Sequence, residues 1–286
     1  MNFDLRTLGP REAQVVLTLE AEKASVVTIE RIREIADVAA SAAMNLASRL
    51  AKKGWLERVT PGKYMLVPAE YGPERTGENN ALALASTVLS PSYVGWWAAA
   101  SFHSFTTQKP FTIHVAATRQ AASREILGSD VHFVKVASSK FFGWEERELY
   151  GRRVTVSDGP KTVLDCVDRM DLSGGPAEVA RIVWGARSVD PELLVDYAER
   201  LGSVATAQRL GFLCDIVGRP LEGPPRERLR ALIPRSARVI VGRKDAQDGD
   251  IGYVREWGVL AHISKDALLS DVPRVRSFGM RAKKVT

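Results

Sequence analysis

The chain has 286 residues, of which 45% are hydrophobic and 26% are charged, a composition that excludes wholesale disorder and predicts a globular protein of two domains. It contains no apolar run near the ~18 residues of a membrane helix and no secretory leader, so we expect a cytoplasmic protein without a membrane partner. The net charge of +6 is concentrated in residues 41–70 (net +3) and the last 52 residues (net +5), which favours a polyanionic partner over two merely solvated basic surfaces.

Three helices are predicted at the N-terminus. Pro10 suits the first turn of a first helix, and Thr28 suits the N-cap of a second. A third helix is expected to begin at Ser41 and to end before Gly54, because glycine favours the position after a last turn. At 100° per residue its leucines share one side with Ala39 and Ala43. The opposite side of this helix presents Ser41, Met44, Asn45, Ser48 and Lys52.

A β-hairpin is predicted after the third helix. Trp55–Val59 and Lys63–Val67 are its strands, and Pro61-Gly62 lies in its turn. Three helices followed by a hairpin is the element order of a winged helix-turn-helix, whose third helix enters the major groove of DNA. We therefore expect a winged helix-turn-helix DNA-binding domain over residues 1–70.

This domain supplies the expected DNA contacts. Asn45 suits an adenine edge and Arg49 suits a guanine or a phosphate, whereas the other cations suit phosphates. A plain surface amide is the alternative for Asn45, and a solvated side chain is the alternative for each lysine. Trp55 and Tyr64 are expected in the hairpin core rather than stacked on bases. The full set of expected DNA-binding residues is Ser41, Met44, Asn45, Ser48, Arg49, Lys52, Lys53, Arg58 and Lys63.

A change of composition separates this domain from the rest. Residues 71–80 are rich in Gly, Pro, Asn and charge, which predicts a linker. Residues 81–286 are expected to form one larger mixed α/β domain, so that the whole chain is α+β. Its expected helices are Ala81–Leu89, Ser92–Phe105, Lys161–Met170, Pro176–Arg187, Asp190–Leu201 and Ser203–Val217. Its expected strands are FTIHVAA, VHFVKVA, RRVTVS and RVIVG.

Catalytic and metal-binding patterns are weak in this second domain. His114 and His132 lie in expected strands without a nearby second ligand, and three aspartates recur at positions 165, 168 and 171 on a helix edge that Arg169 can neutralise. Gly128-Ser129 resembles the start of a nucleotidyltransferase motif, but no acidic pair follows it. Cys166 and Cys214 are expected as buried thiols rather than a disulfide or metal ligands. We expect no enzyme, no cofactor and no metal site.

Several stretches resemble the AbiEi-type antitoxins, a family of transcriptional regulators from bacterial toxin–antitoxin pairs. They are SAAMNLASRLAKKGWLERVTPGKYML, SYVGWWAAASFHSF with KPFTIHVAA, GRRVTVSDGPKTVLDCVDRMDLSGGPAEVARIV, and AQRLGFLCDIVG. Two departures lie in the second domain. Ser104 stands where the family often has glycine, and Pro160-Lys161 stand where an acid–arginine pair is common.

The resemblance implies a function. The winged helix would bind inverted repeats of double-stranded DNA upstream of its own operon and repress it. The second domain would counteract a nucleotidyltransferase-like toxin, with or without a stable complex. The alternative is a protein-interaction module that neutralises the toxin by direct binding. The basic C-terminal segment would either contact further phosphates or form a solvated tail, and its members are Arg235, Arg238, Arg243, Lys244, Arg274, Arg276, Arg281, Lys283 and Lys284.

Overall fold

The computed structural model describes residues 7–22, 24, 26–67, 69, 81–126, 128–149 and 152–273. Internal contacts divide the chain into two units, one of residues 1–102 and 108–162 and the other of residues 103–107 and 163–286. The boundary between residues 162 and 163 falls inside a helix of the region 81–286, and the single domain expected there stays a prediction. The expected linker of residues 71–80 lies outside the described residues, as does the basic segment beyond residue 273.

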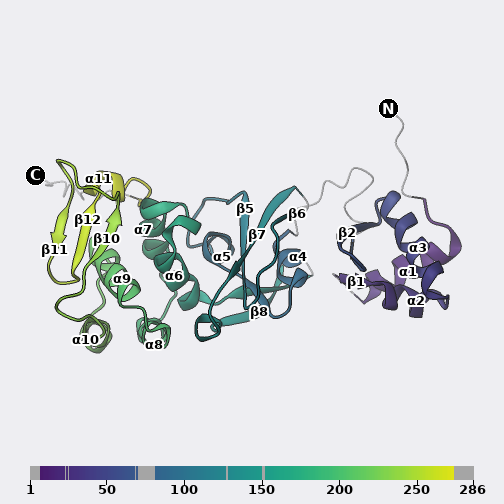
Figure 1. Ribbon diagram of the computed structural model, residues 1–286, viewed down its shortest axis with the longest axis horizontal. Helices are drawn as coiled ribbons and strands as arrows, with labels where there is room; N and C mark the ends of the chain where they lie inside the picture. The colour runs from purple at the N-terminus through teal and green to yellow at the C-terminus, as the bar shows by residue number, and fades with distance from the viewer. Residues whose placement is uncertain are drawn as a thin grey trace, which may run out of the picture. The chain divides into compact units, whose positions relative to one another are not determined.

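The N-terminal part of the first unit is a winged helix-turn-helix. Its strands form an antiparallel sheet in the order β1-β3-β2. Strand β1 was not predicted, because three residues are too few to show an alternating pattern. The elements in chain order are α1 (Pro10–Ala21), β1 (Val26–Thr28), α2 (Ile29–Ala36), α3 (Ala40–Lys52), β2 (Leu56–Thr60) and β3 (Lys63–Leu66) (Figure 1).

Local sequence sets the ends of these elements. Thr28 Oγ1 accepts a hydrogen bond from Arg31 N–H at 3.2 Å, which confirms the predicted N-cap of α2. Asp37 adopts a left-handed φ of 48° and turns the chain between α2 and α3. Gly54, at φ 76°, ends α3 as expected. Ala39 is the exposed N-cap of α3 and does not join the buried side of that helix, which begins at Ala43.

The rest of the first unit is built on a six-stranded mixed sheet in the order β6-β7-β5-β4-β9-β8. The pairs β5–β7 and β4–β9 are parallel, and the other neighbours are antiparallel. Helix α4 contacts β4, β5, β6 and β9, whereas α5 contacts β5. These elements are α4 (Ala81–Val88), β4 (Ser92–Val94), α5 (Trp96–Phe102), β5 (Thr112–Ala117), β6 (Arg124–Ile126), β7 (Ser129–Lys135), β8 (Trp144–Leu149) and β9 (Arg152–Ser157).

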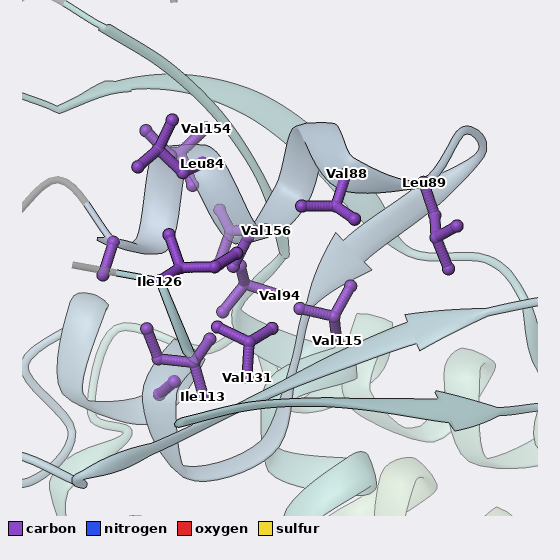
Figure 2. Packing of buried hydrophobic residues seen from close by; sticks show 14 of the residues in the cluster. Leu84, Val88, Leu89, Val94, Ile113, Val115, Ile126, Val131, Val154 and Val156 are labelled. Carbon is purple, nitrogen blue, oxygen red and sulfur yellow. The ribbon is translucent and has the colours of Figure 1, made fainter. Parts of the chain in front are cut away.

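Aliphatic side chains form the core of this sheet. Figure 2 shows Leu84 and Val88 of α4 beside valines of the sheet, such as Val156. Each of these side chains is 5% exposed or less. At about 25 cal/mol per Å² of apolar surface removed from water, such burial is the main source of stability of the sheet and its covering helix.

The helix predicted over Ser92–Phe105 was wrong at its start. Residues Ser92–Val94 form a strand, and the helix begins only at Trp96. All three residues of β4 are buried, because this strand lies in the sheet between β5 and β9. A short apolar run does not distinguish a buried strand from a buried helix by periodicity, which explains the error.

The second unit contains a group of helices and a three-stranded sheet. Strand β12 lies in the centre, parallel to β10 and antiparallel to β11 (Figure 1). Helix α9 contacts β10 and β12. The elements are α6 (Gly159–Asp168), in which the boundary between the units falls, and α7 (Gly175–Gly185), α8 (Pro191–Leu201), α9 (Val204–Ile216), α10 (Gly223–Ala231), β10 (Val239–Gly242), β11 (Gly252–Val254), β12 (Val259–His262) and α11 (Lys265–Leu268). Short 3-10 turns cover Ser138–Lys140 and Met170–Leu172.

Two glycines of the second unit permit close packing. A Cβ at Gly211, in α9, would lie 2.3 Å from the fully buried ring of Trp257. A Cβ at Gly185, at the end of α7, would lie 2.0 Å from the carbonyl oxygen of Phe105. Real Cβ atoms are not found at such distances from other heavy atoms, so both contacts require glycine.

Candidate nucleic-acid interface

The outward side of α3 carries the residues predicted to read DNA. Leu46 and Leu50 are buried at 2% and 0% exposure, whereas Asn45 and Ser48 are exposed. Met44 is 53% exposed, which is high for a large apolar side chain. The side chains near the start of this surface are short and polar, which allows close approach to base edges in a groove. The exposed predicted residues of α3 are Ser41, Met44, Asn45, Ser48, Arg49 and Lys52.

The wing adds two exposed cations. Arg58 lies on β2 and Lys63 begins β3, on either side of the turn that contains Pro61-Gly62. Gly62 has a φ of 77°, which suits the third position of a tight turn. The register of β2 against β3 shifts between Arg58 and Thr60, which marks a bulge. The wing therefore presents positive charge next to the C-terminal end of α3 in the sequence.

Glu12, a buried residue of α1, holds two of the predicted DNA contacts. Its side chain is only 6% exposed, and its Oε2 accepts hydrogen bonds from Lys53 Nζ at 2.5 Å and from Gly9 N–H at 2.8 Å. Arg49 Nε lies 3.3 Å from the other carboxylate oxygen of Glu12. Lys53 is 34% exposed and Arg49 is 61% exposed, so Arg49 remains the more accessible of the two cations.

The pKa of Glu12 reports this environment. Burial disfavours the charged carboxylate, but the hydrogen bonds from Gly9 and Lys53 and the charges of Lys53 and Arg49 outweigh it, so the pKa lies below its ordinary value. The carboxylate is therefore ionised at neutral pH. Sequence reasoning missed this residue, although its position three residues after Gly9 is that of a capping-box acid.

The predicted cations thus fall into two groups. Lys52, Arg58 and Lys63 are exposed and form no ion pair with any residue that the structure describes. Arg49 and Lys53 share the carboxylate of Glu12. A cation that already has a protein counter-charge gains less binding free energy from a phosphate than a cation without one. Lys52, Arg58 and Lys63 are therefore better suited to phosphate contacts.

The aromatic residues of the wing are not available for stacking. Trp55 and Tyr64 are 8% and 9% exposed and belong to the core of the winged helix. They pack in the same cluster as Leu46 and Leu50. This confirms the expectation that they form hairpin core.

The histidines and aspartates that the sequence offered as catalytic candidates contact other residues of the protein. His114 and His132 are register partners on β5 and β7, with ring centroids 5.8 Å apart, so they lie closer together than the sequence suggested. Asp171 forms a two-bond pair with Arg169, and Asp168 accepts a hydrogen bond from Thr206 Oγ1 at 2.7 Å. Within the described ranges, no three His, Cys, Asp or Glu side chains are arranged to hold a metal ion.

The two cysteines do not form a disulfide. Cys166 and Cys214 are both buried free thiols. Burial raises the pKa of Cys214 to about 12, which keeps its thiol protonated and unreactive. None of the helices in the described part of the chain is both long and apolar enough to cross a bilayer.

Comparison with known proteins identifies the N-terminal part of the chain. Residues 14–67 match the family model of the AbiEi antitoxin transcriptional regulators. This span includes every predicted DNA-binding residue, and over these residues the match confirms the resemblance noted from the sequence. No curated protein matches the chain. The crystal structure of the RV2827C protein from Mycobacterium tuberculosis is similar over 92% of this chain and 95% of that chain, with a TM-score of 0.60 and 17% identity, which shows a shared fold.

Proposed function

Because residues 14–67 have the fold and the family match of an AbiEi antitoxin regulator, we propose that this protein is a sequence-specific DNA-binding repressor of its own operon. The observation that carries the proposal is the exposure of Asn45 and Ser48 on α3 above buried leucines. Cations at the end of that helix and on the wing accompany them, and these form no ion pair with a described residue. In a winged helix this is the surface that enters the major groove.

The roles of the individual residues follow from their chemistry. Asn45 and Ser48 contact base edges, and Arg49 contacts a guanine or a phosphate. Lys52, Arg58 and Lys63 contact phosphates, which fix the register of the protein on the duplex. Lys53 contributes to the positive potential of this surface while its ammonium group stays bonded to Glu12. Met44 provides apolar contact, for example to a thymine methyl group.

We further propose that the protein acts as the antitoxin of a nucleotidyltransferase-like toxin encoded beside it. The family match supports an antitoxin role in general. Residues 81–286 lie outside the winged helix, so we assign that role to them. A nucleotidyltransferase-like reading frame in the same operon is the expected genomic context.

A mobility-shift titration on the DNA upstream of the protein's own gene tests the DNA-binding part. We expect a discrete complex at protein concentrations at which random duplex of equal length stays free. Equal affinity for both duplexes would contradict sequence-specific repression.

Co-expression with the neighbouring toxin tests the second part. With both genes under unrelated promoters, we expect the full chain to restore growth, and the variant Asn45→Ala/Lys52→Ala to restore it equally, because protection would not require operator binding. Loss of protection in that variant would contradict a separate antitoxin function. A stable toxin complex combined with no shift of any duplex would favour a purely protein-binding module instead.

A further inference from the structure

The small sheet of the second unit has one buried and one open surface. Val239 and Val241 of β10 and Val259 of β12 are buried on the side contacted by α9. The side chains between them point the other way, because successive residues of a strand alternate. Ile240 and Tyr253 on this open surface are 41% and 46% exposed.

The exposed side chains form a row across the three strands (strand positions in Figure 1). Ile240 of β10 and Tyr253 of β11 are both register partners of Leu260 on the central strand β12. Directly paired residues point to the same side of a sheet. The row is therefore apolar and aromatic, and the exposure of Ile240 and Tyr253 shows that this side of the sheet is open at both outer strands.

Two arginines lie beside this row. Arg238 directly precedes β10 and Arg255 directly follows β11, and the guanidinium of Arg238 lies over the ring of Tyr253. With Arg230 and Arg235 they line a hollow of about 740 Å³, together with Tyr253 and Glu256. We call these six residues the arginine–tyrosine hollow.

Among the described residues, no set of carboxylates balances the positive charge of the arginine–tyrosine hollow. Its one carboxylate, Glu256, already accepts a hydrogen bond from Arg226 outside the hollow at 2.5 Å. Arg235, Arg238 and Arg255 form no ion pair with any residue of the described ranges. Like charges around one hollow repel each other, and an anion bound among them removes that repulsion.

Arg238 is positioned for such an anion. Its Nη1 donates to the carbonyl oxygens of Arg235 and Ala237, at 2.8 and 2.6 Å, and its Cζ lies 4.9 Å from the centroid of the Tyr253 ring. The guanidinium is thereby held on the ring, while Nε and Nη2 have no partner among the described residues. Guanidinium planes and tyrosine rings both stack on nucleobases, and guanidinium forks bind phosphates.

We propose that the arginine–tyrosine hollow is a binding site for single-stranded nucleic acid, distinct from the winged helix. The phosphates contact Arg235, Arg238 and Arg255, and an unpaired base packs on Tyr253 and the apolar row. A free phosphate or an acidic peptide would satisfy the arginines but would leave the exposed aromatic and aliphatic row without a role. A duplex would hide its base faces, so the combination of stacking surface and cations favours a single strand.

The test is fluorescence anisotropy of a labelled 12-nucleotide oligothymidylate with the full chain. Compared with the unmodified protein, Arg235→Ala/Arg238→Ala should weaken binding at least tenfold and flatten the plot of log K against log salt by about 1.4, the value for two phosphate contacts on a single strand. The control Arg119→Ala/Arg153→Ala removes the same charge from exposed positions of the first unit, and should change the affinity less than threefold.

Tyrosine variants separate nucleic acid from other polyanions. Tyr253→Ala should weaken oligothymidylate binding about 5- to 150-fold, the range for loss of one stacked base, and Tyr253→Phe should restore it. Binding of inorganic polyphosphate should not depend on this ring. If Tyr253→Ala leaves oligothymidylate affinity unchanged, or if both arginine pairs have equal effects, the proposal is wrong.

A last variant separates this site from the winged helix. Asn45→Ala/Lys52→Ala should impair binding of the operator duplex and leave oligothymidylate affinity within twofold. If that variant instead loses the oligothymidylate while Arg235→Ala/Arg238→Ala keeps it, the single strand binds the winged helix and the hollow is not the site. Failure of operator binding alone would affect only the proposed repressor function. Melting temperatures of all variants check that each remains folded.

Discussion

Lys53 Nζ donates to Glu12 Oε2 at 2.5 Å and so connects the end of α3 to the first turn of α1. The same carboxylate accepts the Gly9 N–H, and its partner oxygen lies 3.3 Å from Arg49 Nε. One buried acid therefore both caps α1 and withholds positive charge from the proposed DNA surface. The strength of DNA binding and the stability of the winged helix are expected to change in opposite directions when this acid is neutralised.

Glu12→Gln tests this opposition. The amide can still accept a hydrogen bond from Gly9, but Lys53 and Arg49 lose their counter-charge and become available to phosphates. We expect tighter binding to any duplex, with a salt slope steeper by about 0.9 for each additional phosphate contact. The free energy of unfolding should fall by about 1–2 kcal/mol, since a charge-assisted hydrogen bond is lost. Glu30→Gln, with the same change of charge at an exposed position on α2, is the control for salt titrations and urea denaturation.

The pH dependence of stability follows from the lowered pKa of Glu12. A carboxylate whose pKa is lower in the folded state stabilises the fold above its unfolded pKa, about 4.3, and loses that contribution as the pH falls through the folded pKa. The difference in unfolding free energy between the unmodified chain and Glu12→Gln should therefore be largest near neutral pH and shrink below about pH 4.3. Urea denaturation at pH 7, 5 and 3.5 measures it. A difference independent of pH would contradict the ion pair.

Asn45→Ala and Lys52→Ala distinguish base reading from phosphate contact. Loss of Asn45 should reduce the preference for operator over random duplex by about 1–3 kcal/mol. Loss of Lys52 should weaken both duplexes by a similar factor and flatten the salt slope by about one. Titrations at several salt concentrations provide both quantities, and an unchanged preference in Asn45→Ala would assign base reading to other residues.

Gly211→Ala tests the contact between α9 and Trp257. Alanine favours a helix over glycine by about 1 kcal/mol, but its Cβ would lie 2.3 Å from the indole ring. We expect a net loss of about 1–3 kcal/mol of stability from overpacking, measured by urea denaturation. Ala205→Gly in the same helix should cost only the helix-propensity difference of about 1 kcal/mol. A stabilised Gly211→Ala protein would show that the ring moves freely.

Ser104 offers a stabilising substitution. Its φ of 59° lies in the left-handed region, which costs a non-glycine residue about 1–2 kcal/mol. Ser104→Gly should raise the free energy of unfolding by up to about 1 kcal/mol, because the relieved strain exceeds the added entropy of the unfolded chain. The exposed Ser123, whose φ is not positive, is the matched control: Ser123→Gly should not stabilise in thermal denaturation.

Much of the winged helix could be predicted from the sequence. The N-cap at Thr28, the end of α3 at Gly54 and the separation of Asn45 from the buried Leu46 are local properties, set by residues close together in the chain. Periodicity and capping chemistry report such properties directly. The excess of positive charge in residues 41–70 could also be counted from the sequence alone.

The remaining features depend on tertiary packing. Glu12 and Lys53 are 41 positions apart, and only the fold brings them together. Strand β8, with the sequence WEEREL, shows no clean alternation because it lies at an edge of its sheet and is mostly exposed. Arg235 and Arg238 of the arginine–tyrosine hollow belong to the basic segment seen in the sequence. Arg230, Tyr253 and Arg255 come from helix α10, strand β11 and the turn after it, so only the fold brings the whole set together.

The short segment of residues 103–107 belongs to the second unit, although both of its flanks belong to the first. Phe105 in this segment places its carbonyl oxygen against Gly185, which a ribosome adds 80 positions later. During synthesis, all residues of the first unit are therefore added before Gly185, the contact of Phe105, has been made. For the same reason, a fragment that begins at residue 163 lacks the buried Phe105 and the rest of residues 103–107. Cleavage of one peptide bond therefore does not separate the two units.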